Sequence, residues 1–127
     1  MSHFTTIKTQ IKDIAALRSA CDELNLRLRE NAHARGYAGQ SRRGEFVIQL
    51  KGPYDIAVNR EPDGNYGLTT DWWQGHVEKE VGPNFGRLLQ LYGVHKATAE
   101  ARRKGFSVLR QPQRNGSIKL VLLGGAS

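Results

Sequence analysis

Three strand-like runs joined by short turns occupy the middle of the sequence. The runs are rich in aliphatic and aromatic side chains and cover Glu45 to Leu50, Tyr54 to Asn59 and Tyr66 to Trp72. The joining sequences, Gly52-Pro53 and Pro62-Asp63-Gly64-Asn65, are typical of turns. Connections this short reverse the chain but cannot carry a parallel crossover. Residues 45–73 therefore predict an antiparallel meander, against which the rest of the chain must pack.

Helical patterns lie on both sides of the meander. Asp13 can cap a helix near 14–25, because apolar side chains follow it at steps of three and four: Ile14, Leu17, Cys21 and Leu24. Val77 to Val81 can form one helical turn. Asn84 can then cap a long amphipathic helix that ends before Gly105, a suitable residue just past a helix C-terminus.

Further strand-like runs lie near the two ends of the chain. Phe4 to Ile11 predicts a first strand, and Leu26 to Arg29 predicts a short strand with one basic face. Phe106 to Gln111 and Ser117 to Leu123 flank Asn115-Gly116, which predicts a hairpin closed by a type I′ turn.

The predicted element order is β-α-β-βββ-α-ββ, without an internal repeat or an interdomain linker. This order favours an α+β fold, in which an antiparallel sheet of about five to seven strands carries two helices on one face. A chain of 127 residues has the length of one domain. We therefore assign residues 1–123 to a single domain and residues 124–127 to a frayed C-terminal tail.

Composition argues against several classes of protein. No apolar run approaches the roughly 20 residues of a membrane span, and no apolar segment follows the N-terminus. Cys21 is the only cysteine, which excludes an internal disulfide and cysteine-rich metal sites. The four histidines lack the spacing of zinc ligands. We expect a cytoplasmic protein without a cofactor, a metal or a membrane partner.

Positive charge is concentrated in two segments of a chain whose net charge is +7. Residues 27–43 have a net charge of +4 and residues 96–119 have +6. Arginine predominates in both, and guanidinium groups bind phosphate through paired hydrogen bonds. If the segments adjoin after folding, their basic side chains form one surface for a polyanion. These candidate residues are Arg27, Arg29, Arg35, Arg42, Arg43, Arg102, Arg103, Lys104, Arg110 and Arg114.

Aromatic and acidic side chains supply the remaining candidates. Residues 31–44 show no periodicity, which predicts a mobile loop, and Tyr37 in that loop can stack on a base. Adjacent tryptophans in a strand face opposite sides, so either Trp72 or Trp73 is available for stacking or for a protein partner. Asp55 and Asp71 lie on adjacent predicted strands and can form an acid–base pair, with His76 nearby in sequence.

Several short motifs spread along the chain resemble those of a known family. They are the opening run from Met1 to Ile11, Phe46-Val47-Ile48, Tyr54-Asp55-Ile56, Tyr66-Gly67-Leu68, Asp71-Trp72-Trp73 and the region from Tyr92 to Arg102. The family is the hypothetical chloroplast reading-frame 35 family of cyanobacteria and algal plastids. The resemblance implies a domain of unknown function in the cytoplasm or the plastid stroma, and it supplies no catalytic residues.

Three functions remain open at this point. The leading hypothesis is a non-enzymatic module that binds RNA, DNA or another polyanion through the two arginine-rich segments. The first alternative is an accessory subunit that docks an acidic protein partner through the tryptophan face and the sheet edge. The second alternative is a small enzyme that uses Asp55, Asp71 and His76.

Overall fold

The computed structural model describes residues 3–125 and has the predicted α+β fold. Five antiparallel strands form one sheet in the order β1-β5-β4-β3-β2, and two more form a separate hairpin. The strands are β1 (Phe4–Lys8), β2 (Arg27–Arg35), β3 (Ser41–Gln49), β4 (Ile56–Arg60), β5 (Tyr66–Asp71), β6 (Phe106–Pro112) and β7 (Ile118–Gly124). The helices are α1 (Ile14–Glu23), the single turn α2 (Glu78–Val81) and α3 (Gly86–Arg103).

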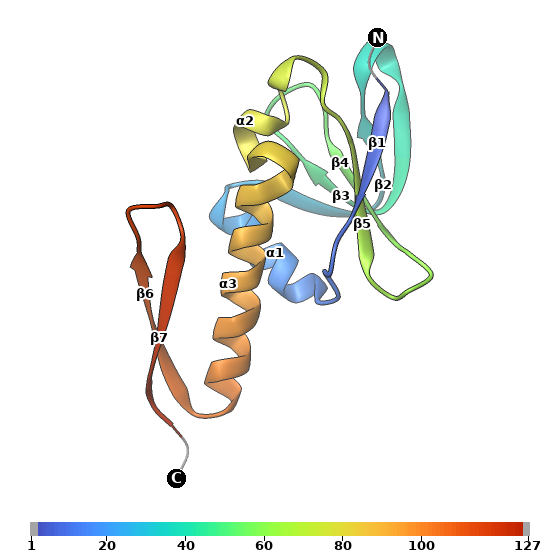
Figure 1. The fold of residues 1–127 in the computed structure, drawn as a ribbon. Coiled ribbons are helices and arrows are strands. Elements are labelled where there is room, and N and C mark those ends of the chain that lie inside the picture. The colour runs from blue at the N-terminus through green and yellow to red at the C-terminus, as the bar shows by residue number, and fades with distance from the viewer. Residues whose placement is uncertain (1–2, 126–127) are drawn as a thin grey trace.

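The main core lies between the sheet and the helices α1 and α3. Both helices cover the same face of the sheet, and the β6–β7 hairpin packs on the far side of α3 (Figure 1). Asp13 caps α1 as predicted, because its carboxylate accepts the Ala16 N–H at 3.1 Å. The Tyr92 hydroxyl of α3 accepts the N–H groups of Lys12 and Asp13, which ties the long helix to the start of α1.

The prediction of a mobile loop over residues 31–44 is wrong. These residues form the outer half of a β2–β3 hairpin that bends across the second face of the sheet. Ala34 at its end packs on Val47 and Ala57 in a small second core. The bend needs a glycine, since a Cβ at Gly44 would overlap the carbonyl oxygen of Phe46. The hairpin therefore closes over the sheet instead of extending into solvent.

Two local predictions also need correction. Asn84 does not cap α3: the chain turns through a left-handed Phe85 (φ 63°), and the helix starts at Gly86 without a side-chain cap. This turn buries the Phe85 ring completely. At the β6–β7 turn, Gly116 alone has a positive φ, and its N–H donates to the Gln113 carbonyl at 3.1 Å. The turn is therefore type I followed by a glycine bulge, not type I′.

The C-terminal strand runs slightly beyond the predicted domain end. β7 ends at Gly124, while residues 126–127 of the predicted tail lie outside the described residues. Within residues 3–125, none of the helices is long and apolar enough to cross a membrane.

Candidate functional site

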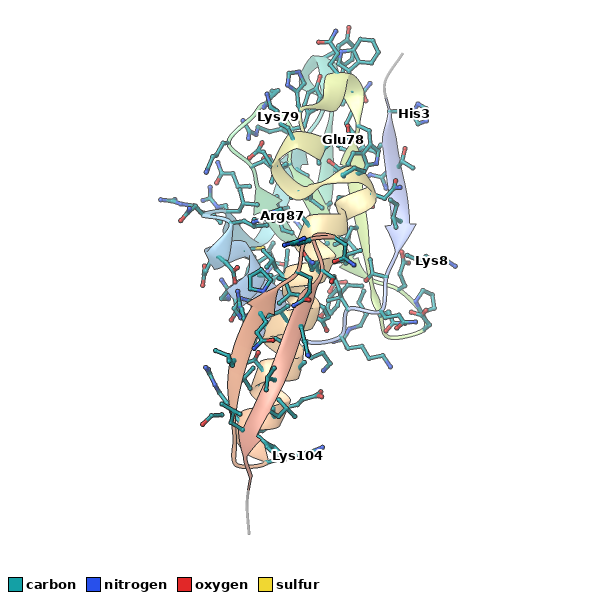
Figure 2. All side chains as sticks on the ribbon, turned by 60° about the vertical axis from the view of Figure 1, so that its left-hand side comes forward. His3, Lys8, Glu78, Lys79, Arg87 and Lys104 are labelled. Atoms are coloured by element: carbon teal, nitrogen blue, oxygen red, sulfur yellow. The ribbon has the colours of Figure 1, made fainter. Side chains whose placement is uncertain are left out.

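The structure does not bring the two arginine-rich segments into one patch. The exposed side chains Arg102, Arg103 and Lys104 lie at the C-terminal end of α3. The tip of the β2–β3 hairpin, which carries Arg35, Arg42 and Arg43, lies at the opposite end of the molecule (Figures 1 and 2). These two clusters of basic side chains therefore do not form one continuous patch.

Two predicted binding residues in these segments are engaged inside the protein. Arg110 on β6 forms paired hydrogen bonds of 3.0 and 2.9 Å with the Glu23 carboxylate, which also contacts His95 at 2.8 Å. The hydrogen bonds from Arg110 hold the pKa of Glu23 below its usual value. Arg42 lies over the Phe4 ring, 5.5 Å from its centroid. Arg110 thus fastens the β6–β7 hairpin to α1 through both of its Nη atoms.

A concave basic surface follows β2 where the bent hairpin faces the β3–β4 connection. It consists of two adjoining grooves, of about 220 and 200 Å³, that share Gln49. Basic side chains line both of them, and we call the surface the β2 groove: Arg27, Arg29, His33, Arg35 and Lys51. Arg27 and Arg29 are two residues apart on an extended strand, so their side chains project on the same side. The surface is thus basic along its whole length.

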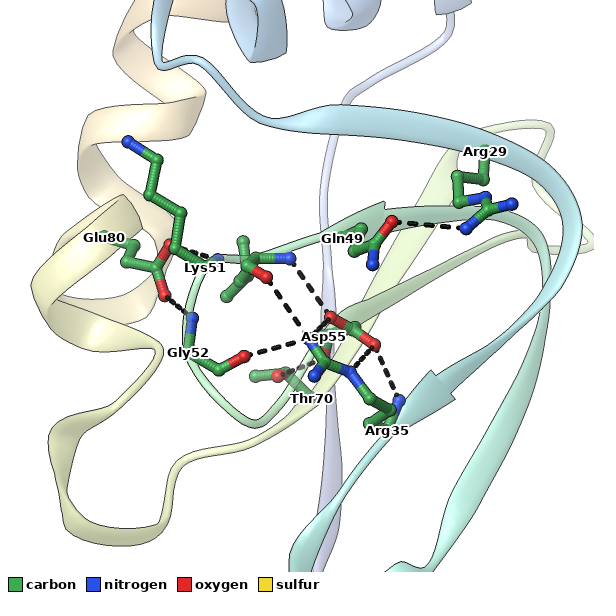
Figure 3. Close-up of polar contacts among 9 residues, drawn as sticks. Arg29, Arg35, Gln49, Lys51, Gly52, Asp55, Thr70 and Glu80 are labelled. Atoms are coloured by element: carbon green, nitrogen blue, oxygen red, sulfur yellow. Dashed lines mark hydrogen bonds and ion pairs between the residues drawn. The ribbon is translucent and has the colours of Figure 1, made fainter.

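The Arg35–Asp55 pair fixes one end of the β2 groove (Figure 3). Asp55 is 2% exposed, and its carboxylate accepts the Arg35 N–H, Nε and Nη2 at 3.0, 2.8 and 2.8 Å. It also accepts the Leu50 N–H at 3.1 Å. These hydrogen bonds raise the pKa of the Arg35 guanidinium, which stays half exposed. The only carboxylate lining the groove is therefore already neutralised, and the guanidinium is held in place.

A second cluster places two aromatic rings beside the hairpin tip. Tyr37 and Trp73 have ring centroids 5.7 Å apart, and Tyr37 is 41% exposed. The fully buried carboxylate of Asp71 accepts the backbone N–H of Tyr37 at 3.2 Å and that of Trp73 at 3.0 Å. One buried acid thus holds both aromatic residues, which we call the aromatic pair.

The two tryptophans follow β5 and are not part of it. Trp72 and Trp73 lie where β5 gives way to a short 3₁₀ turn, so the rule that neighbours in a strand face opposite sides does not apply. Trp72 packs on Phe85, with ring centroids 4.6 Å apart, whereas Trp73 meets Tyr37. Both are half-buried. Trp73, beside an exposed ring, is the one placed near a ligand surface.

The groups of the enzyme hypothesis lie near one another, but the acids are inaccessible. Asp55 and Asp71 fall opposite each other when the β4–β5 register is extended by two residues. Both carboxylates are buried and accept hydrogen bonds from N–H donors. Of the three groups, only the half-buried His76, which packs edge-on to Tyr54, is accessible to a substrate. Within residues 3–125, no group of three or more histidine, cysteine or acidic side chains is arranged to hold a metal ion. The cluster supports structure better than proton transfer.

Sequence reasoning missed three members of the β2 groove: His33, Gln49 and Lys51. Lys51 follows a strand and His33 falls in the segment predicted as a loop. The alternation of basic side chains at Arg27 and Arg29 is a usable signal for the start of the groove, but it does not extend to His33, because Asn31 interrupts the regular strand with a left-handed φ of 47°. Lys51 and Gln49 reach the groove through tertiary structure alone.

Comparison with known proteins agrees with the resemblance noted in the sequence. Residues 20–121 match the family model described as protein of unknown function (DUF1257). The chain is 29% identical to the uncharacterized protein ycf35 of Pyropia yezoensis over 126 residues, covering 96% of each chain. It is 28% identical to that of Cyanophora paradoxa and 31% identical to that of Guillardia theta, again over 96% of each chain. No solved structure matches it significantly.

Proposed function

The chain belongs to the DUF1257 family of uncharacterized ycf35 proteins, and from its own surface we propose that it binds the phosphate backbone of a nucleic acid in the β2 groove. One observation carries the proposal: three basic side chains that form no salt bridge within residues 3–125, Arg27, Arg29 and Lys51, line two adjoining grooves, and the carboxylate lining them is already paired with Arg35. We propose that it acts in the cytoplasm or the plastid stroma.

The charge of the β2 groove is available to a ligand. Arg29 donates to the neutral side chain of Gln49 at 3.3 Å, which orients the guanidinium without cancelling its charge. The nearby Glu80 carboxylate is occupied by the backbone N–H groups of Lys51 and Gly52, at 2.8 and 3.0 Å. Guanidinium groups hold two oxygens of a phosphate at once, and a nucleic-acid backbone offers a phosphate at every nucleotide along such a groove.

The geometry also distinguishes the groove from the other basic regions. Arg102, Arg103 and Lys104 form an exposed cluster at a helix end, where positive charge already offsets the helix dipole. Arg114 lies in the exposed β6–β7 turn. Neither region lines one of the grooves named above, so the β2 groove is the better candidate for ordered phosphate contacts.

The test is a salt titration of binding to a fluorescent single-stranded RNA of about 20 nucleotides, a length that exceeds typical single-strand site sizes. For a single strand, each phosphate contact adds about 0.7 unit to the magnitude of the slope of log affinity against log salt. We expect the double variant Arg27→Gln/Arg29→Gln to lower that slope by one to two units. The matched control Arg102→Gln/Arg103→Gln removes the same charge elsewhere and should lower it less.

Three results would overturn the proposal. Undetectable binding at the lowest salt would exclude nucleic-acid binding. An equal loss in both double variants would show that the groove has no special role. Stronger binding of polyglutamate than of RNA would favour an acidic protein partner instead.

A further inference from the structure

We infer that the bound nucleic acid is single-stranded and that one of its bases stacks on the aromatic pair Tyr37 and Trp73. This inference rests on the proposed function, since it names the kind of nucleic acid that the β2 groove and the aromatic pair together would select.

Two turns with the same pattern present the aromatic pair. Each turn starts with the aromatic residue, continues with a non-glycine residue in the left-handed region and ends with a left-handed glycine. The first turn is Tyr37-Ala38-Gly39, with φ values of 56° and 78° at its last two residues. The second turn is Trp73-Gln74-Gly75, with φ values of 55° and 71° at the same places. Left-handed non-glycine residues are strained and cluster at functional sites.

A buried charge fixes the spacing of the two turns. Asp71 is 0% exposed, and its two oxygens accept hydrogen bonds from the first N–H of each turn. Burying a carboxylate without a cationic partner is costly, and here the donors are the backbone amides of the aromatic residues themselves. The fold therefore carries both strain and a buried charge where two aromatic rings meet the surface.

The distance between the β2 groove and the aromatic pair suits one nucleotide. Tyr37 follows Arg35 by two residues, and two residues of extended chain span about 7 Å. Successive phosphates of an extended single strand have a similar spacing. On this backbone spacing, a strand with one phosphate at the half-exposed Arg35, whose Nη1 makes no hydrogen bond within residues 3–125, can place the adjacent base on Tyr37. A duplex cannot do so, because its bases are already stacked inside the helix.

The ring of Tyr37 is the best residue to test, because it is 41% exposed and its removal should not affect folding. Stacking on an aromatic side chain contributes at least about fivefold to affinity per base. We expect Tyr37→Leu to weaken binding of a 20-mer single-stranded RNA by about fivefold or more, whereas Tyr37→Phe should keep the affinity. Binding of a duplex of the same length should be weaker and unaffected by either change.

A matched ligand separates stacking from phosphate contacts. An oligonucleotide with abasic sites keeps the phosphates but lacks the bases, and it should bind the wild type no better than the normal strand binds Tyr37→Leu. Circular dichroism and thermal unfolding would show that Tyr37→Leu still folds.

The possible failures are distinguishable. If no oligonucleotide binds even at low salt, the proposed function itself fails. If RNA binds with steep salt dependence but Tyr37→Leu has no effect, or the duplex binds as tightly as the single strand, phosphate binding stands and the stacking inference is overturned. Either of these two results would make the aromatic pair a contact for something other than a base.

Discussion

Replacing Asp55 by asparagine tests whether one carboxylate holds the bent hairpin against the sheet. In the native protein this carboxylate is almost completely buried and accepts four hydrogen bonds, from the backbone N–H groups of Arg35 and Leu50 and from two guanidinium nitrogens. Asparagine has nearly the same shape, but it loses the charge and turns an N–H₂ group toward these donors.

The cost follows from which donors lose their partner. A buried backbone N–H left without an acceptor costs about 1–3 kcal/mol. The Arg35 side chain is 49% exposed and can be rehydrated, so its contribution is small. We therefore expect Asp55→Asn to lower the free energy of unfolding by about 2–4 kcal/mol. For a chain of 127 residues this corresponds to a fall in Tm of about 8–15 °C.

Urea unfolding followed by tryptophan fluorescence measures this loss, since Trp72 and Trp73 lie close to the hairpin tip. The midpoint should fall while the slope m stays the same. Asp63→Asn is the matched control, because Asp63 is an exposed turn carboxylate whose recorded bonds are to Asn65. A midpoint for Asp55→Asn equal to that of the wild type would refute the argument that this carboxylate fastens the hairpin.

Three further predictions concern other parts of the molecule. Gly44→Ala should destabilise the protein by more than about 1 kcal/mol, because the new Cβ would overlap backbone atoms. Gly93→Ala, in open space on α3, should stabilise it by about 0.5–1 kcal/mol. Urea unfolding of both variants shows whether the free energy of unfolding falls in the first and rises in the second. Hydrogen bonds from Arg110 lower the pKa of Glu23 in the folded state. The ionised Glu23 carboxylate therefore stabilises the fold fully above its usual pKa of 4.5, and this stabilisation is lost as pH falls through the folded-state pKa. Wild type should thus be more stable than Glu23→Gln at pH 7, and the gap should close below about pH 4.5; a gap that stays constant down to pH 3 would contradict this. Burial raises the pKa of Cys21 to about 12, so iodoacetamide should label it only after unfolding, and rapid labelling of the native protein in a mass spectrum would disprove its burial.

The elements that the sequence predicts well are those specified by neighbouring residues. Asp13 caps a helix whose apolar stripe is complete within ten residues. The turn at Pro62-Asp63-Gly64-Asn65 closes on itself, because Gly64 donates to Glu61 and Asn65 donates to Asp63. Such contacts are local in sequence, and pattern reasoning can find them.

The bent hairpin could not be predicted in the same way. Its glycines and arginines have the composition of a loop, and its strand character depends on pairing between β2 and β3, with Arg35 opposite Ser41 at the tip. The bend is held by Asp55, which lies 20 residues beyond Arg35. No residue within the segment specifies these partners, so its lack of periodicity predicts a mobile loop where the structure has a hairpin.

The candidate site shows the same division. Sequence identifies which side chains are basic, but it cannot tell which of them a carboxylate neutralises. Glu23 engages Arg110 across 87 residues of chain, and this removes one predicted ligand from the surface. Conversely, Gln49 and Lys51 enter the β2 groove because β3 pairs with β2, which places Gln49 opposite Arg27.

An arginine-rich edge strand has a purely structural explanation that must be weighed against binding. β2 is the last strand of its sheet, and charged side chains on such an edge prevent pairing with another chain. That role needs only scattered charge on a flat or convex edge. Here the bend makes the edge concave, and Asp55 holds one guanidinium at a fixed place within it. Protection from aggregation requires neither concavity nor a fixed guanidinium, and under the proposed function variants that straighten the hairpin should lose binding before they lose solubility.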